Sequence, residues 1–209
     1  MAKQKQLNVA LIGYRFMGAA HSNAYLNVDK FFKLPAKAHM KVIVGRKGSS
    51  KELEATAKTW GWEEVSRDYK KVLERDDIDI VDIVTPNNTH AEIAVAAAKA
   101  GKIVFCEKPL AMDVAECKKV VDAVKKSRKP SLVWFNYRFV PAVSLAKQIL
   151  DEGRLGTIYH MRAHYLQDWI MDPDFPLVWR LKKEVSGSGA HGDLNAHIID
   201  MARFLVGDF

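Results

Sequence analysis

The residues best suited to chemistry follow a short apolar run near the middle of the chain. Ile103–Cys106 has the length and the β-branched content of a strand that is buried on both faces. Glu107, Lys108 and Pro109 come directly after it. Because ligands of open parallel sheets bind beyond the carboxyl ends of the strands, Lys108 would lie at the rim of a crevice, presented by a turn that Pro109 fixes. The alternative is that the three residues form an ordinary polar strand exit.

A second candidate pair lies near the end of the chain. The pattern from about residue 192 to 206 predicts a helix, and Asp193 and His197 are four residues apart in it. Side chains at this spacing face the same place. A separate apolar stripe is expected to pack inward, and it comprises Leu194, Ile198, Met201 and Leu205. The polar pair would then face a cleft; the alternative is a structural Asp–His contact on the helix surface.

Two other polar residues of this region are left out of the predicted chemistry. Asp200 continues the polar face, but Arg203 is a ready ion-pair partner for it. His191 could form a metal site with Asp193 and His197, but their spacing matches no standard zinc pattern. No metal site is therefore expected.

A glycine-containing turn near the amino terminus predicts a dinucleotide site. Leu7–Ile12 is typical of a buried strand, and the chain becomes helix-like from residue 16 to about 32. Such a turn lets the backbone approach a pyrophosphate, and the helix amino terminus supplies free N–H groups and a partial positive charge. The match to the G-x-G-x-x-G fingerprint is incomplete, because Arg15 stands in place of the second glycine and would either lie against a phosphate or point to solvent. The residues expected at the pyrophosphate are Gly13, Phe16, Met17 and Gly18.

The end of the next predicted strand, Met40–Val44, bears on the choice between NAD and NADP. In an NAD site an Asp or Glu at this place binds the ribose 2′-hydroxyl. This chain has Gly45, Arg46 and Lys47 instead. The two cations favour a 2′-phosphate, and therefore NADP, with Arg46 at the adenosine ribose. The alternative is that they are plain loop charges.

The clearest strand in the sequence, Ile78–Val84, is followed by a polar segment. Asn87 is placed to hydrogen-bond a cofactor ribose or carboxamide, whereas Asn88 and Thr89 are expected to cap the following helix. His90 either contacts the cofactor or acts as a structural hydrogen bonder. The residues expected toward the nicotinamide are Thr85, Pro86, Asn87, Glu107 and Lys108.

Strands and helices alternate up to about residue 133, which is the signature of an α/β fold with a doubly wound parallel sheet. The pattern then changes. Pro141–Glu152 predicts a helix, and Thr157–Asp168 alternates like a long half-exposed strand. We therefore expect a dinucleotide-binding domain over residues 1–133 and a different domain over residues 134–209.

Composition restricts the class of protein. The 209 residues are 48% hydrophobic and 27% charged, an ordinary balance for a globular protein. The net charge of +7 is spread as lysine pairs over several predicted helices, which indicates solvated helix faces or attraction of anionic ligands and offers no nucleic-acid motif. Cys106 and Cys117 predict no disulfide framework and favour a reducing compartment. No run approaches the ~20 apolar residues of a membrane span, and Gly13 and Arg15 interrupt the signal-like amino terminus, so a cytoplasmic protein is expected.

Taken together, these motifs resemble those of the Gfo/Idh/MocA oxidoreductases, the glucose–fructose oxidoreductase and inositol dehydrogenase family of sugar and polyol dehydrogenases. They occur in the family's order over nearly the whole chain, namely Gly13…Gly18, Thr85-Pro86-Asn87…His90, Glu107-Lys108-Pro109, Trp179-Arg180 and Gly192-Asp193…His197. The resemblance implies a Rossmann domain followed by an α/β domain with a large open sheet. That second domain carries the substrate site in the family and commonly builds homo-oligomers.

The resemblance also implies roles for individual residues. Lys108, Asp193 and His197 would be catalytic, and the Lys108–Pro109 peptide bond would be cis. Trp179 and Arg180 would close over the cofactor. Asn136 and Arg138 are expected to line the same cavity.

Two features depart from the family pattern. Arg15 replaces the usual second glycine, and the sequence stops at Phe209, whereas family members continue well past the D-x-x-x-H helix. We therefore expect a truncated product or a fragment that carries only the beginning of the second domain.

The predicted reaction is the reversible oxidation of a secondary alcohol of a sugar or polyol with NAD(P). His197 is the first choice of base, because an imidazole has a pKa of about 6.5. Lys108 would stabilise the developing negative charge or relay the proton, and Asp193 would bind an adjacent hydroxyl or orient the histidine. The alternative is a non-catalytic nucleotide-binding regulator or an inactive remnant of the family; neither a membrane nor a nucleic acid is expected as a partner.

Overall fold

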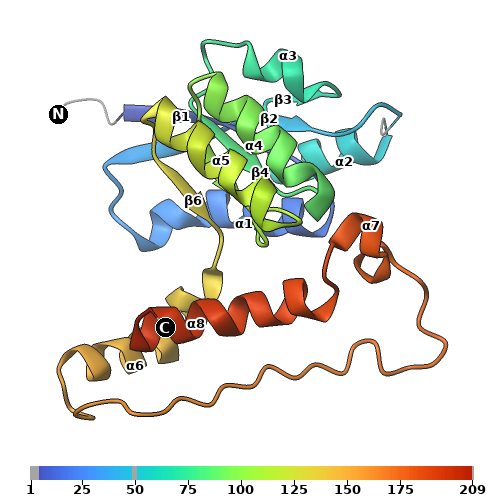
Figure 1. Ribbon diagram of the computed structural model, residues 1–209. Helices are drawn as coiled ribbons and strands as arrows, with labels where there is room; N and C mark the ends of the chain where they lie inside the picture. Colours follow the sequence, from blue (N-terminus) through green and yellow to red (C-terminus); the bar gives the residue numbers. More distant parts are fainter. Residues whose placement is uncertain (1–4, 49–50, 209) are drawn as a thin grey trace. The chain divides into compact units, whose positions relative to one another are not determined.

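The computed structural model describes residues 5–48 and 51–208. The chain divides into two compact units, 1–133 and 134–209, and each is described by itself (Figure 1). The first unit is an α/β fold and the second is helical with a long extended segment.

The first unit is built on a single six-stranded parallel sheet with the strand order β3-β2-β1-β4-β5-β6. The strands are β1 (Lys5–Ile12), β2 (Ala36–Val44), β3 (Glu64–Ser66), β4 (Ile80–Ile83), β5 (Ile103–Cys106) and β6 (Ser131–Val133). The sequence predicts a strand at five of these places, the fifth being an apolar run over residues 131–135 that coincides with β6. It does not predict β3, because three residues are too few to show a periodicity.

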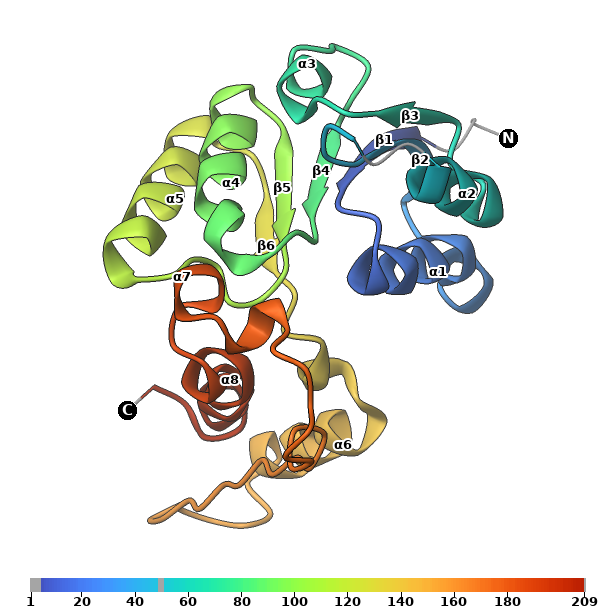
Figure 2. The ribbon, with the colours of Figure 1, turned by 90° about the vertical axis from the view of Figure 1, so that its right-hand side faces the viewer.

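Both faces of this sheet are covered by helices, which are α1 (Phe16–Phe31), α2 (Lys51–Trp60), α3 (Tyr69–Leu73), α4 (His90–Lys99) and α5 (Val114–Ser127). Figure 2 shows α4 and α5 on one face of the sheet and α1 and α2 on the other. Successive side chains of β1 pack on opposite faces of the sheet. Ala10 and Ile12 lie in the α4–α5 layer, and Val9 and Leu11 lie in the α1–α2 layer. Since both layers are apolar, the central strands are continuous hydrophobic runs rather than alternating ones.

The order of the strands reverses between β1 and β4. The chain proceeds outward from β1 to β3, and then outward from β4 to β6 on the other side. In sheets of this kind, ligands bind beyond the carboxyl ends of the strands at the place where the order reverses. The turns after β1, β4 and β5 are therefore the ones that could form a site.

The second unit contains two longer helices, α6 (Pro141–Asp151) and α8 (Ala196–Val206), which contact each other. Shorter elements are the 3₁₀ turns Asn136–Phe139 and Trp179–Leu181, α7 (Lys183–Ser186) and a π-helical turn, His191–Asn195. The π turn replaces the first part of the helix predicted from residue 192. Across residues 5–48 and 51–208, none of the helices has both the length and the apolar character required to cross a membrane.

The strand predicted over residues 157–168 does not form among the described residues. This part of the chain is extended without strand pairing (Figure 1), and Tyr159 and Leu166 are 92% and 87% exposed. A strand needs a neighbour to bind its backbone N–H and C=O groups, and the described part of the second unit offers none. The prediction of a strand at this place is therefore wrong for this structure, although the alternating pattern is that of one.

Candidate active site

The turn after β1 is a place where backbone segments approach closely. Gly13 has a φ of +111°, and its N–H donates to the carbonyl oxygen of Val44 at 2.9 Å. A Cβ at Gly13 would lie 2.8 Å from the carbonyl oxygen of Val84, and a Cβ at Gly18 would lie 2.8 Å from that of Gly13. Both positions therefore require glycine for steric reasons.

Arg15 stands at the N-cap of α1, where the fingerprint has its second glycine. Its φ is −78°, which any residue can adopt, so the backbone does not require glycine here. The guanidinium is exposed and lies 3.7 Å from the carboxylate of Glu52. Within the described residues, Arg15 makes no side-chain hydrogen bond to the end of α1. The first N–H groups of α1 are thus suited to an anion, as helix amino termini are in general.

A hollow of about 320 Å³ lies beside the end of β2 and the start of α2. It is lined by Tyr14, Arg15, Arg46, Lys47, Gly48 and Glu52. Glu52 accepts a hydrogen bond of 3.1 Å from the Tyr14 hydroxyl. The sequence does not mark this carboxylate as a site residue, because it belongs to the first turn of α2 and not to the end of β2, where an NAD site usually has its acid. Arg46 lines the hollow, and its contact with an adenosine ribose stays a prediction.

Hydrogen bonds of the His90 and Thr89 side chains hold the segment after β4 in place. The ring nitrogens of His90 lie 2.8 Å from the carbonyl oxygens of Pro109 and Thr85, and the ring is 1% exposed. Both nitrogens are engaged with backbone, so the structure favours the structural role for His90 and not the cofactor contact. Thr89 stands at the N-cap of α4, as predicted, but its hydroxyl donates to the Thr85 hydroxyl and makes no cap hydrogen bond to the helix. Asn87 is buried, and its contact with a cofactor stays a prediction.

The segment after β5 is held to β4 by its backbone. The N–H of Glu107 donates to the carbonyl oxygen of Ile83 at 2.8 Å, which continues the parallel ladder beyond β5. The Lys108–Pro109 peptide bond is cis, as the resemblance implies. Lys108 is half-buried in this turn. Burial raises the pKa of the preceding Cys106 thiol far above its ordinary value, which disfavours the reactive thiolate.

Beneath this turn lies a cluster of buried ionisable groups that the sequence analysis did not single out. His21 Nδ1 lies 2.8 Å from Asp82 Oδ2, and His21 Nε2 lies 3.0 Å from Glu107 Oε1. Tyr25 donates its hydroxyl hydrogen to Asp82 at 2.9 Å. The available signal was Asp82 itself, a charged residue in the middle of an apolar strand. Its partner His21 could not be inferred, since it comes from α1.

The surroundings of His21 favour its charged form. Burial alone would lower its pKa, but the hydrogen bonds to Asp82 and Glu107 and the charges of both carboxylates raise the pKa to about 9. Both ring nitrogens therefore donate, one to each carboxylate. Burial and the charge of Asp82 raise the pKa of Tyr25 well above its ordinary value, so its hydroxyl stays protonated and donates.

The stability of the protein is expected to fall as the pH rises from about 6.5 to about 9. The pKa of His21 is about 9 when folded and about 6.5 when unfolded, so its stabilising contribution is complete below the lower value and disappears through the higher one. The full contribution is roughly 3–4 kcal/mol. Urea denaturation at several pH values measures it; His21→Gln should flatten this dependence, and His39→Gln should keep it. A wild-type stability that is constant over the window would contradict a charged His21.

In the second unit, three aromatic rings surround the imidazole of His197. Its imidazole is 7% exposed and stacks on Tyr137 with 4.2 Å between ring centroids. Phe135 and Tyr165 meet it edge-on. The hydroxyls of Tyr137 and Tyr165 are 2.5 Å apart, and burial, this hydrogen bond and the charges of Tyr165 and Asp193 raise the pKa of Tyr137 to about 12. The plane of the His197 ring is therefore fixed by packing.

The polar face of α8 differs from the prediction in one respect. His197 and Asp200 are its buried residues, whereas the predicted apolar stripe is half-buried. Asp200 does not pair with Arg203 as expected. It accepts two hydrogen bonds from the guanidinium of Arg138, one of them at 2.8 Å, and Arg203 pairs with Asp208 at 2.5 Å. The reason is that Arg138 reaches Asp200 from a different segment, which spacing along the helix cannot reveal.

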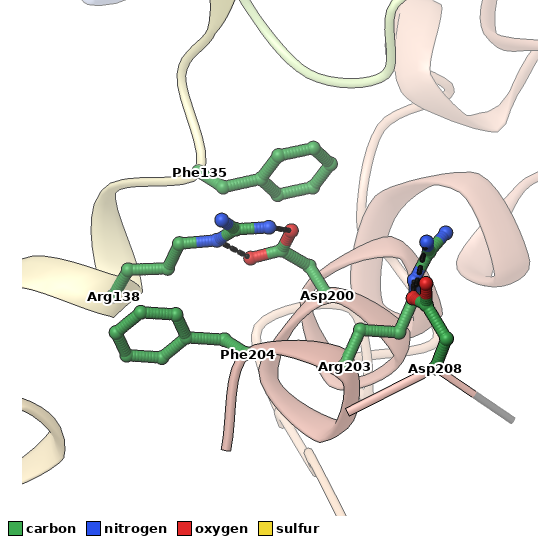
Figure 3. Close-up of a pocket in the computed structure, with 6 residues that line it drawn as sticks. All are labelled: Phe135, Arg138, Asp200, Arg203, Phe204 and Asp208. Carbon is green, nitrogen blue, oxygen red and sulfur yellow. Dashed lines mark hydrogen bonds and ion pairs between the residues drawn. The ribbon is translucent and has the colours of Figure 1, made fainter. Parts of the chain in front are cut away.

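This ion pair forms the wall of a cavity of about 510 Å³ (Figure 3). The cavity is lined by Phe135, Arg138, Asp200, Arg203, Phe204 and Asp208. The guanidinium of Arg138 lies between the rings of Phe135 and Phe204, at 6.0 and 5.3 Å from their centroids. Both arginines pair with carboxylates, so their charges are balanced within the cavity wall. That Arg138 also touches a cofactor stays a prediction.

The other residues proposed for this unit are placed as follows. Asn136 is exposed, Asp193 is half-buried in the π turn, and the guanidinium of Arg180 lies 4.5 Å from the ring centroid of Trp179. Throughout residues 5–48 and 51–208, no group of three or more His, Cys, Asp or Glu side chains is arranged to hold a metal ion.

Each of the two units matches the model of a known protein family. Residues 7–135 match the model of the oxidoreductase family with an NAD-binding Rossmann fold, and residues 143–209 match the model of the Gfo/Idh/MocA C-terminal domain. The chain is 50% identical over 207 residues to a levoglucosan dehydrogenase of Pseudarthrobacter phenanthrenivorans, an alignment that spans 98% of this chain and 52% of that protein. It is 28% identical to a D-apiose dehydrogenase of Paraburkholderia graminis, over 98% of this chain and 51% of that protein.

Solved structures of oxidoreductases are similar to this chain over nearly its whole length. Levoglucosan dehydrogenase in complex with NADH and levoglucosan superposes with a TM-score of 0.94 at 48% identity, over 98% of this chain and 55% of that chain. An oxidoreductase domain protein from Kribbella flavida gives the same values. The chain thus spans about half the length of the relatives that it matches. It belongs to the Gfo/Idh/MocA family of oxidoreductases.

Proposed function

We propose that this chain carries the cofactor site and the catalytic side chains of an NAD-dependent dehydrogenase that oxidises a secondary alcohol of a sugar. The observation that carries the proposal is the position of the Lys108 turn at the carboxyl end of β5, next to β4. Ligands of doubly wound sheets bind on this side. The half-identical relative supports an anhydrosugar of the levoglucosan type as substrate.

The first unit fits a dinucleotide. A Cβ would clash with backbone at Gly13 and Gly18, so the turn before α1 keeps the close backbone approach that a pyrophosphate needs. Residues that would hold the cofactor are Gly13, Phe16, Met17, Gly18, Arg46, Thr85, Pro86, Asn87, Glu107 and Lys108. In the second unit, Asn136, Arg138, Trp179 and Arg180 would complete the site.

The chain's own side chains would handle the proton of the alcohol. A bound nicotinamide ring supplies the hydride acceptor. His197 would take the hydroxyl proton, because an imidazole exchanges protons near neutral pH. The ammonium group of Lys108 would stabilise the negative charge that develops on the same oxygen. Asp193 would bind a neighbouring hydroxyl or orient His197.

The cations at the end of β2 led to the expectation of NADP, which the comparisons do not support. The levoglucosan dehydrogenase structures contain NADH. Glu52 offers a reason on this chain: its carboxylate lines the hollow beside Arg46 and would accept hydrogen bonds from ribose hydroxyls. A 2′-phosphate placed against Glu52 would be repelled by this carboxylate, whereas Arg15, Arg46 and Lys47 of the same hollow would attract it.

We expect NADH to bind at least about tenfold more tightly than NADPH, since one lost charge-assisted hydrogen bond plus repulsion exceeds 1.4 kcal/mol. Fluorescence titration with the two nucleotides measures this ratio. Glu52→Gln should narrow the ratio, whereas Glu54→Gln, in the same helix but paired with Arg67, should not. Tighter binding of NADPH to the wild type would overturn the choice of NAD.

Turnover is tested by the absorbance of NADH formed from NAD with levoglucosan, L-sorbose and myo-inositol. Oxidation of a sugar by this chain supports the proposal. A second candidate, a nucleotide-binding protein without turnover, is favoured by the unpaired segment 157–168, because residues 134–208, as the structure describes them, form no sheet that could hold a sugar. Tight NADH binding with no oxidation of any sugar would decide for this candidate.

A further inference from the structure

The buried cluster around His21 connects three elements of the first unit at the carboxyl side of the sheet. His21 comes from α1, Asp82 from β4, and Glu107 directly follows β5. The side chains of Asp82 and Glu107 are 0% and 11% exposed, and that of His21 is 11% exposed. Two carboxylates at this depth need a positive partner, because burying an unpaired charge is costly. The ring of His21 lies between them and supplies that charge.

Glu107 links this cluster to the proposed catalytic lysine. Its Oε1 binds His21, and its Oε2 accepts a hydrogen bond of 3.2 Å from the backbone N–H of Lys108. The backbone N–H of Glu107 is fixed separately by the carbonyl oxygen of Ile83. The residue before Lys108 is thus held both by its backbone and by its side chain.

We propose that His21 is a positioning residue for Lys108: its doubly hydrogen-bonded ring holds the carboxylate of Glu107, which in turn fixes the backbone that presents the lysine. The inference rests on the proposed function in so far as Lys108 is catalytic. His21 itself touches neither the cofactor nor the substrate in this account.

The double hydrogen bond makes the arrangement dependent on the charge of His21. A neutral imidazole has a single N–H and can donate to Asp82 or to Glu107, but not to both. The titratable groups that face the ring or the two carboxylates are Asp82 of β4, Glu107 after β5, Tyr25 of α1 and Cys106 at the end of β5. Asp82 is fully buried and lies closer to the ring than Glu107 does, at 2.8 against 3.0 Å, so the contact with Glu107 is the one that loss of the proton releases.

Hydrogen exchange of the Lys108 amide tests this without any assay of activity. In His21→Phe, which has a ring but no N–H donor, exchange at Lys108 should become about tenfold faster or more, the loss expected for a hydrogen bond to a charged group. The amide of Ile103, at the other end of β5 and bonded to Asp79, reports global opening and should change much less. His39→Phe removes another histidine–carboxylate contact, with Glu63, and should leave Lys108 unchanged.

The pH dependence of amide exchange in the wild type provides a second test that needs no substitution. After correction for the intrinsic effect of pH, exchange at Lys108 should accelerate relative to Ile103 as the pH passes through the pKa of His21, about 9. His21→Gln, whose amide nitrogen can donate twice without a charge, should abolish this acceleration. These readings decide the matter even where His21→Phe does not fold.

Kinetics separate positioning from a merely structural role. His21→Phe should lower kcat by up to about 100-fold, the effect of a misplaced catalytic group, with KM and NADH affinity changed little. Unchanged exchange at Lys108 in a folded variant, or faster exchange with an unchanged kcat, would overturn the inference. If the wild type oxidises no sugar while exchange at Lys108 responds as described, the proposed function fails and the part of His21 in holding the turn is supported.

Discussion

Replacing Lys108 with Met is expected to lower sugar oxidation by about 10²–10⁴-fold and to change NADH affinity by less than about threefold. The methionine side chain is of similar length but has no charge and no N–H group, so it cannot stabilise the negative charge on the reacting oxygen. The turn itself should remain, because Glu107 and the backbone of Ile83 hold it from the other side. Initial rates with saturating NAD, together with a fluorescence titration with NADH, measure the two quantities.

Two variants serve as controls for this substitution. Lys99→Met removes an exposed lysine at the end of α4 and should leave turnover intact. Lys108→Arg keeps the charge but changes the geometry of the donors, and should recover only part of the activity. Near-normal turnover in Lys108→Met would remove the lysine from the mechanism. A large loss of NADH affinity would instead mean that Lys108 mainly binds the cofactor.

Gly13→Ala is expected to destabilise the first unit by roughly 3–5 kcal/mol, with a loss of NADH binding. Its φ of +111° is rarely adopted by residues with a Cβ, and the added atom would lie 2.8–2.9 Å from the carbonyl group and side chain of Val84. Neither β1 nor β4 can move away, because each is hydrogen-bonded to strands on both sides.

Gly101→Ala provides the matched control for Gly13→Ala. It also has a positive φ, +72°, but an added Cβ would meet nothing within 4 Å. Its cost should therefore be limited to the backbone strain of about 1–2 kcal/mol. Urea denaturation followed by circular dichroism compares the two variants. Equal stabilities would show that the close approach to Val84 is not a constraint.

Much of the first unit could be predicted from the sequence because its signals are local. The apolar runs at β1, β4 and β5 fall in the structure where the sequence predicts strands. The glycines of the first turn have the backbone and steric restrictions that their positions suggested. The strand β3 and the bounds of β2 were less accessible, because they depend on pairing with neighbours more than on composition.

The charged contacts were much harder to predict, because they join segments far apart in the chain. Asp200 was assigned to Arg203 on helical spacing, but Arg138 binds it. His90 was a candidate for the cofactor and is instead engaged by two backbone carbonyls. A hydrogen bond has a range of about 3 Å, so its partner is set by the packing of elements and not by residue type.

The sequence by itself determined the alternation of strands and helices, the glycine turn before α1 and the placement of Lys108 directly after a buried strand. These depend on short-range patterns of apolar residues, on the missing Cβ of glycine and on the ring of proline. Only the tertiary structure placed His21 between Asp82 and Glu107, Glu52 beside Arg46, and Tyr137 against His197. The physical reason is that buried charges and rings acquire their partners, and with them their protonation, only when separate elements pack together.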